Sequence, residues 1–436
     1  MEWSWQRIPA EYVVTNIKLC RNGKVGKRKG FLHVRKGRFE GIGVGTPSLE
    51  GLPVLDGEGL VCAPGFIDTH VHFREPGEEE KESVATGCRA AAAGGYTAVV
   101  TMPNTSPAID NAGLVKYLID RAKETNLCRI YPAGSISHQL EGESMTEFAD
   151  MIAAGAVGFS DDGSPVANGG LMSNALKYAR VLGVPILTHA EDKTIVGKGV
   201  MHGGYWSARL GMAGMARAGE DSAIFRDIEL ARSSKGHLHV CHVSTKGAVD
   251  LIRRAKAEGV HVTAEATPHH FSLDHGKCRD FSPLFKMNPP LREQDDINAI
   301  AEGLADGTID CIATDHAPHT MTEKEHQFDQ APFGVIGLET AFAVGITYLV
   351  KTGVLDLGQL VDCLSSKPAA ALNLPGGNLD EGLVADFVLL DPNREWTVEA
   401  TGFQSRSRNS SYIGEKLTGK VVATFLRGRL TWRLED

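Results

Sequence analysis

Short apolar, β-prone runs alternate with stretches of helical spacing through the middle of the chain. The runs are bounded by glycine, proline or polar residues, as expected for buried strands. We expect eight strands, at residues 62–68, 96–101, 129–133, 156–160, 185–188, 237–242, 261–265 and 309–314. Between most of them, apolar residues recur every three or four positions, as in 112–125 and 245–258. Strand and helix alternating eight times predicts an α/β fold, a (β/α)8 TIM-like barrel.

Both ends of the chain have a different pattern, with strand-like runs only. These runs are 12–20, 30–35, 38–44 and 51–56 near the N-terminus, and 385–390, 395–398 and 420–427 near the C-terminus. A simple account is that the two terminal segments pair into one small β domain. We therefore predict that residues 1–60 and 376–436 form this domain and that residues 61–375 form the barrel.

Composition and charge narrow the class of protein. Apolar residues make up 42% of the 436 residues and charged residues 23%, which is ordinary for a globular chain. The net charge of −9 argues against a nucleic-acid partner. No stretch approaches the roughly 18 apolar residues that span a bilayer, and the first residues show no signal-peptide core. The eight cysteines include no CxxC pair. We expect a cytoplasmic protein that binds neither nucleic acid nor membrane.

Side chains able to bind metal collect where the predicted strands end. They are His70 and His72 after the first strand, Asp161 and Asp162 after the fourth, His189 after the fifth, His242 after the sixth and Asp315 after the eighth. Active sites of such barrels lie at the C-terminal ends of the strands. Imidazole and carboxylate without thiolate suit zinc, manganese, iron or cobalt. The sequence therefore predicts a catalytic metal site with an open position for water.

Two assignments stay open on spacing alone. Period-two spacing does not choose between Asp161 and Asp162. Asp315 fits a metal ligand, a general base or the cap of a following helix. As a base, it would take a proton from a metal-bound water and pass it to a leaving nitrogen.

Five blocks of sequence, in order, resemble dihydroorotases of the amidohydrolase superfamily, with the bacterial type I members most similar. The blocks are residues 68–77, 101–105, 159–163, 287–292 and 313–319. The resemblance extends from about residue 56 to residue 425. It implies a barrel with a β-sandwich built from both terminal segments. It also implies the reversible cyclisation of N-carbamoyl-L-aspartate to L-dihydroorotate in de novo pyrimidine synthesis.

The resemblance further implies one or two zinc ions per subunit and a role for each ligand. One ion would be held by His70, His72 and Asp315, and the other by His189 and His242, with Asp162 as the bridge. Asp315 would also be the catalytic residue. It would accept a proton from the water that supplies the attacking hydroxide, and it would donate that proton to the leaving ring nitrogen.

Substrate contacts follow in the same way. Arg74 is two residues after His72, so it faces the same mouth and can grip a carboxylate bidentately. The resemblance implies further contacts from Asn104, Asn288, His319, Phe333 and Gly334. The polar stretch 319–334 is expected to be a mobile lid over the substrate, with an ordinary flexible loop as the alternative.

Two other functions compete with this interpretation. One is another cyclic amidohydrolase, of the hydantoinase or dihydropyrimidinase kind. Many such enzymes bridge their metals with a carboxylated lysine at strand four, and this chain has no lysine between Lys123 and Lys177. The other is a non-catalytic partner of an aspartate transcarbamoylase. A homodimer and a complex with that enzyme are the assemblies that the resemblance leaves open.

Overall fold

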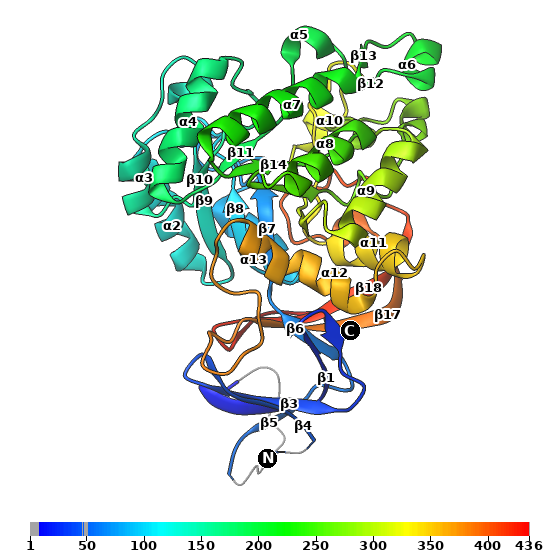
Figure 1. Ribbon diagram of the computed structural model, residues 1–436. Coiled ribbons are helices and arrows are strands. Elements are labelled where there is room, and N and C mark those ends of the chain that lie inside the picture. The colour runs from blue at the N-terminus through cyan, green and yellow to red at the C-terminus, as the bar shows by residue number, and fades with distance from the viewer. Residues whose placement is uncertain (1–7, 46, 48–50, 436) are drawn as a thin grey trace.

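The computed structural model describes residues 8–45, 47 and 51–435 (Figure 1). A large lobe has helices packed around parallel strands, and a smaller lobe below it consists of strands from both ends of the chain. Residues 1–7, 46 and 48–50 of the predicted N-terminal segment and residue 436 of the predicted C-terminal segment lie outside the described residues.

Eight parallel strands form the barrel, and they follow one another in chain order. They are β7 (Phe66–Val71), β8 (Tyr96–Thr101), β9 (Arg129–Gly134), β10 (Gly158–Phe159), β11 (Ile186–Thr188), β14 (Leu238–Val240), β15 (Val262–Ala266) and β16 (Cys311–Ile312). A parallel bridge between Val71 and His316 brings the end of the eighth strand back to the first. The backbone N–H of His72 also donates to His316 O at 2.9 Å. The prediction of a (β/α)8 barrel is confirmed.

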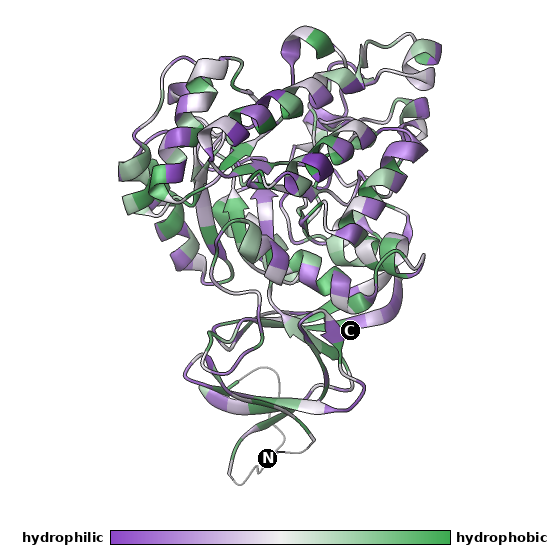
Figure 2. Cartoon of the chain, in the orientation of Figure 1, coloured by the Kyte–Doolittle hydropathy of each residue, from purple (hydrophilic) through white to green (hydrophobic). Residues whose placement is uncertain are grey.

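Helices cover the outside of these strands. The longer ones are α1 (Val84–Ala93), α2 (Ala112–Thr125), α3 (Phe148–Ala154), α4 (Gly169–Leu182), α7 (Arg217–Ser234), α8 (Lys246–Ala257), α9 (Gln294–Asp306), α12 (Leu357–Leu364) and α13 (Ser366–Ala371). In α2 the side chain of Asn111 caps the first turn, and Val115, Leu118 and Ala122 are buried on one face. Figure 2 shows this mixture of apolar and polar residues along the outer helices.

Short elements occupy the loops above the barrel. They are α5 (Lys193–Val196), β12 (Met201–His202), α6 (Tyr205–Leu210), β13 (Gly214–Met215) and α10 (Met321–Lys324), whereas α11 (Ala341–Gly345) lies lower, against β18 (Lys416–Leu426) of the smaller lobe. Most lie at the top of Figure 1, at the end where the barrel strands finish.

The predicted strand 62–68 is wrong in one respect, because it joins parts of two sheets. Its first half is β6 (Val61–Pro64), which belongs to the smaller lobe, and its second half is the start of β7. The chain passes between them at Gly65, where a Cβ atom would lie 2.3 Å from Thr97 Oγ1. A continuous apolar run does not reveal such a change of sheet.

The smaller lobe unites the two terminal segments in one nine-stranded sheet. Its strands are β1 (Glu11–Arg21), β2 (Lys24–Val25), β3 (Gly30–Arg35), β4 (Arg38–Val44), β5 (Val54–Asp56), β6, β17 (Phe387–Thr397), β18 (Lys416–Leu426) and β19 (Arg429–Arg433). β6 pairs with β1 on one side and with β17 on the other. The rings of Phe387 and Phe425 stack 4.2 Å apart in the core of this lobe. We propose that the boundary with the barrel lies near Gly65, a few residues after the predicted one.

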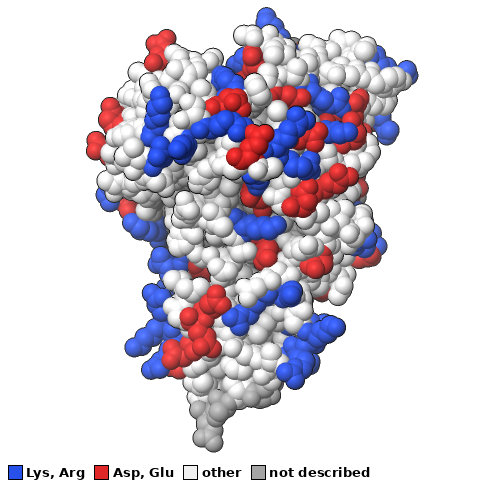
Figure 3. Space-filling model, viewed as in Figure 1, with Lys and Arg blue, Asp and Glu red and all other residues white. Residues whose placement is uncertain are grey.

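Three further observations bear on the class of protein. No helix among the described residues is long and apolar enough to cross a membrane. All eight cysteines are buried and none forms a disulfide. On the face shown in Figure 3, acidic and basic side chains are interspersed over the helices.

Candidate active site

The ends of five barrel strands bring six predicted metal ligands together. Asp162 lies at the centre of the group. His70 Nε2 is 3.5 Å from Asp162 Oδ1, and His72 Nε2 is 3.6 Å from Asp162 Oδ2. On the other side, His189 Nδ1 and His242 Nε2 are 3.5 and 3.7 Å from Asp162 Oδ1. One carboxylate therefore touches two histidine pairs that are far apart in the sequence.

Asp315 completes the group beside the first pair. Its Oδ1 lies 3.6 Å from His70 Nε2 and 3.0 Å from His72 Nε2. Asp315 has φ of 47° and His242 has φ of 34°, a backbone region that non-glycine residues rarely adopt. Asp315 is not a helix cap, because the next helix is capped by the side chain of Thr320.

The neighbouring Asp161 has a different environment. Its Oδ1 accepts the backbone N–H groups of Ile136 (2.7 Å) and Ser137 (3.0 Å), and its Oδ2 accepts the Ser137 hydroxyl. These bonds use the carboxylate to hold the loop after β9. Of the two aspartates that spacing left open, only Asp162 faces the histidines.

The chemistry of the six residues fits divalent cations. Asp162 and Asp315 are buried, and neither has a lysine or arginine within ion-pair distance among the described residues. Asp162 Oδ1 and His70 Nε2 are buried atoms without a hydrogen-bond partner. Asp162 belongs to two sets of potential metal ligands, one with His70 and His72 and the other with His189 and His242. Within each set the ligand atoms lie within 4.8 Å of one another. Unpaired buried donors of these types are what a metal ion satisfies.

The ionisation of the group points the same way. Burial alone would raise the pKa of Asp162, but the charge of His70 and the nearby imidazoles of His189 and His242 hold it well below its usual range. Burial would likewise lower the pKa of His189, yet the carboxylates of Asp162 and Glu191 raise it to about 9. Without a cation the site therefore retains protons on imidazole, and metal binding would release them.

Glu265, which the sequence interpretation left without a role, holds the first histidine in place. It is fully buried on β15, and its Oε1 accepts His70 Nδ1–H at 2.9 Å. Its Oε2 accepts His239 Nε2–H at 3.0 Å and the hydroxyl of Thr69. Glu265 therefore binds the Nδ1 side of the His70 ring, and Nε2 is the nitrogen that faces Asp162. The sequence signal that could have identified Glu265 is its charge at the end of a buried apolar run.

Two other polar contacts orient the histidines. His72 Nδ1 lies 2.8 Å from Asn104 Oδ1, so the predicted substrate residue Asn104 also positions a predicted ligand. Asn288 Nδ2 donates to Glu191 Oε2 at 2.6 Å, and that carboxylate lies 3.6 Å from His189 Nε2. Glu191 is a further residue that the sequence interpretation passed over, although it follows His189 by two.

A cavity of about 240 Å³ opens above these groups. Its lining includes every predicted site residue except His70, which lies deeper. The lining residues are His72, Arg74, Asn104, Asp162, Gly163, His189, His242, Asn288, Asp315, Ala317, His319, Phe333 and Gly334.

Arg74 brings a positive charge to this cavity. It is buried, its Nε donates to Pro318 O at 3.2 Å, and no carboxylate among the described residues forms an ion pair with it. Burial lowers the pKa of Arg74, and the nearby acids Glu78 and Asp315 oppose that shift. His319 Nε2 lies 3.3 Å from Arg74 Nη2 and 2.8 Å from Phe333 O. A guanidinium without an internal counter-ion is suited to a carboxylate ligand.

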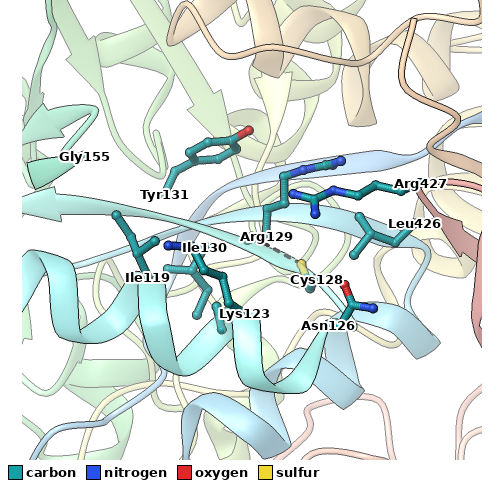
Figure 4. Close-up of a pocket in the computed structure, with 11 residues that line it drawn as sticks. Ile119, Lys123, Asn126, Cys128, Arg129, Ile130, Tyr131, Gly155, Leu426 and Arg427 are labelled. Atoms are coloured by element: carbon teal, nitrogen blue, oxygen red, sulfur yellow. Dashed lines mark hydrogen bonds between the residues drawn. The ribbon is translucent and has the colours of Figure 1, made fainter. Parts of the chain in front are cut away.

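A larger cavity, of about 330 Å³, lies at the other end of the barrel (Figure 4). It is lined by α2, β9 and the turn after β18, and its polar side chains include Arg129, Arg427 and Tyr131. None of the described residues that line it is a histidine, aspartate or glutamate. Size therefore does not identify the site, because this cavity is larger than the one at the strand ends and a third cavity, beside Lys36 and Arg429, is larger still at about 660 Å³.

Comparison with known proteins identifies the family. Residues 59–248 match a family described as dihydro-orotase-like. The chain is 49% identical over 382 residues to a dihydroorotase of Syntrophotalea carbinolica, covering 88% of this chain and 90% of the relative. The chain belongs to the dihydroorotase family. A dihydroorotase of Pelobacter propionicus is 46% identical over 402 residues, covering 92% of this chain and 95% of the relative.

Solved structures support the same class of enzyme, but they identify its activity less specifically than the sequence relatives do. The L-hydantoinase (dihydropyrimidinase) from Arthrobacter aurescens superimposes with a TM-score of 0.88 at 26% identity, covering 98% of this chain and 97% of that one. The dihydroorotase relatives are much more similar in sequence, so they decide between the two activities. The chain is therefore a cyclic amide hydrolase of the dihydroorotase family.

Proposed function

We propose that this enzyme interconverts N-carbamoyl-L-aspartate and L-dihydroorotate at a pair of zinc ions. Asp162 is the single observation that carries the proposal, because it lies between two histidine pairs and within a cavity that also contains Arg74 and Asp315. Zinc is proposed because the donors are imidazole and carboxylate, in sets that leave positions for water and substrate.

Arg74 gives the substrate its orientation. Both N-carbamoyl-L-aspartate and L-dihydroorotate carry a carboxylate that does not react, and the buried guanidinium would bind it bidentately. Asn104 and His319 border the same part of the cavity. Asn288 would contact the carbamoyl side of the ring, and the backbone near Phe333 and Gly334, which also lines the cavity, would touch the substrate. Uncharged rings such as hydantoin lack the group that Arg74 would bind.

Asp315 moves the proton in both directions. When bound, the metal ions supply Lewis-acid chemistry that activates water and polarises the amide carbonyl. In ring opening, the Asp315 carboxylate takes a proton from the attacking water and gives it to the ring nitrogen as the carbon–nitrogen bond breaks. In ring closure, the Asp315 carboxylate takes a proton from the carbamoyl nitrogen as the carbon–nitrogen bond forms, and gives that proton to the carboxylate oxygen, which leaves as hydroxide. The low pKa of Asp315, opposed by burial and produced by His72 and His70, keeps it ionised before ring opening.

The test combines metal analysis with kinetics in both directions. Wild type is expected to contain zinc and to prefer dihydroorotate over hydantoin and dihydrouracil. Asp315→Asn is expected to lose about 100-fold or more in kcat, because general acid–base catalysis contributes about that much. Substantial activity of this variant would contradict the proton shuttle, and preference for the uncharged rings would contradict the Arg74 clamp. A chain that binds no metal and turns over neither substrate would instead be a non-catalytic partner.

We further propose that the enzyme is cytoplasmic and forms a homodimer. The alternative assembly is a complex with an aspartate transcarbamoylase. This part of the proposal rests on the family resemblance alone. Light scattering of the purified chain, with and without that partner enzyme, distinguishes the two assemblies.

A further inference from the structure

The loop 319–334 borders the catalytic cavity along one side. It provides His319, Phe333 and Gly334 to the cavity lining. Beneath it runs the segment 283–288, which contains a 3-10 turn at Pro283–Phe285 and provides Asn288 to the same lining. The seam between these two segments therefore decides where one wall of the cavity lies.

Lys324 joins the two sides of this seam. Its Nζ donates to Pro283 O at 3.0 Å and to Lys286 O at 3.3 Å, both on the lower segment, and to Pro332 O at 2.8 Å at the end of the loop. Lys324 is only 4% exposed. Among the described residues, no carboxylate pairs with its ammonium group. The three carbonyl groups are its hydrogen-bond partners.

Lys286 makes the reciprocal contacts from the lower segment. Its Nζ donates to Asp329 O on the loop at 3.1 Å and lies 4.6 Å from the ring centroid of Phe333. Its carbonyl oxygen also accepts the backbone N–H of Gly334 at 2.9 Å. Lys286 is 2% exposed, so both side chains work in a region from which water is largely excluded. Each lysine thus links its own segment to the opposite one.

Two buried ammonium groups without carboxylate partners are costly to maintain. Burial lowers the pKa of Lys324 to about 7 and that of Lys286 to about 8. Removing Lys324 would leave three buried carbonyl groups without that donor. The open loop would then be favoured, because water could hydrogen-bond to these carbonyl groups. The cost is understandable if the position of the loop matters for binding.

We propose that Lys324 and Lys286 are positioning residues that fasten the loop 319–334 to the segment 283–288 and so hold Phe333 and Gly334 in contact with the substrate. The inference rests on the proposed function, because only then does the cavity bind dihydroorotate. It replaces a freely mobile lid with a loop that is held closed by hydrogen bonds from two buried lysine side chains. Neither lysine touches a predicted metal ligand, so metal content should not depend on them.

The test compares Lys324→Met and Lys286→Met with the control Lys277→Met. Lys277 lies 5.9 Å from the ring of Phe285 and pairs with Glu415, without contacting the loop. Both test variants are expected to raise KM for dihydroorotate about 10-fold, with kcat changed less than about 3-fold and zinc content unchanged. Loop opening should also accelerate cleavage by a glutamate-specific protease at Glu323 and Glu325 about 10-fold.

Chemical rescue separates this role from general destabilisation. Lys324→Ala lacks a propylammonium unit, so added propylammonium should lower its KM toward the wild-type value, whereas propanol should not. A KM within about twofold of wild type and unchanged proteolysis in both Met variants would overturn the proposal, as would metal loss or a fall in kcat at constant KM. If wild type does not turn over dihydroorotate, the proposed function fails, and the protease comparison still decides whether the lysines fasten the loop.

Discussion

Replacing Glu265 with glutamine tests how the first histidine pair is prepared for a metal ion. The carboxylate accepts four hydrogen bonds, from the side chains of His70, His239 and Thr69 and from the backbone N–H of His242. A glutamine has one acceptor oxygen in place of two, and its amide nitrogen would face a donor on at least one side. If that side is His70, the ring proton moves to Nε2, the nitrogen that faces Asp162. The variant should therefore bind metal more weakly without losing the fold.

The size of the effect follows from the contacts. Loss of a carboxylate that orients a metal-binding histidine weakens metal affinity by about 10- to 100-fold. That factor corresponds to about 1.4 to 2.8 kcal/mol, which is comparable to one hydrogen bond to a charged group. The loss should stop short of abolishing binding, because the Thr69 hydroxyl can rotate to accept from the new amide.

A competition titration against a coloured chelator measures the affinity directly. Glu220→Gln is the matched control, because Glu220 is also buried and accepts from Ser244, Thr245 and Arg292, away from the histidines. Both variants should lose stability, and only Glu265→Gln should lose metal affinity. Equal affinity of Glu265→Gln and wild type, within a factor of about two, would refute the orienting role.

Three further outcomes are expected. Gly65→Ala should destabilise the protein by about 1–3 kcal/mol in a urea titration, since its Cβ would collide with Thr97; an unchanged midpoint would contradict the tight crossing. Burial raises the pKa of Glu339 to about 7, so it stabilises the fold most below its unfolded pKa near 4.5, and this contribution disappears as pH rises to about 7. The Tm of Glu339→Gln should therefore exceed that of wild type by more at pH 8 than at pH 5, and a constant difference would contradict this. Asp162→Asn should lower the metal content whereas Asp161→Asn should not, as measured by elemental analysis, and equal loss in both would contradict the bridging role.

The sequence predicted the barrel well because its strands are separated by clear helical periods. The predicted helix 112–125 has the bounds of α2, and the predicted strand 96–101 has those of β8. The pattern failed at Gly65, since an uninterrupted apolar run contains no sign that the chain leaves one sheet for another. The strand β19 was also not predicted, although Leu430 and Trp432 alternate with polar residues, because an alternation over only five residues is a weak signal.

The candidate site shows the same division. Residues at strand ends were found because the barrel fixes where such ends meet, and the cavity lining contains all but His70 of them. The choice between Asp161 and Asp162 needed coordinates, since two adjacent side chains differ only in which neighbours they reach. Glu265 was missed because its partner His70 is distant in sequence. The two lysines that join the loop 319–334 to the segment 283–288 could not be found, since ordinary lysines are exposed and the pattern carries no sign of burial.

The position of β6 between β1 and β17 also constrains the order in which the strands can pair while the chain is being synthesised. β1, β3 and β4 can pair soon after they leave the ribosome, because they are neighbours in the sequence. The other edge of β6 must wait for β17, which is synthesised only after the whole barrel. During that interval a buried strand, joined directly to the first barrel strand, presents an open edge. Chains that end before β17 should therefore aggregate through β6 even when the barrel sequence is complete.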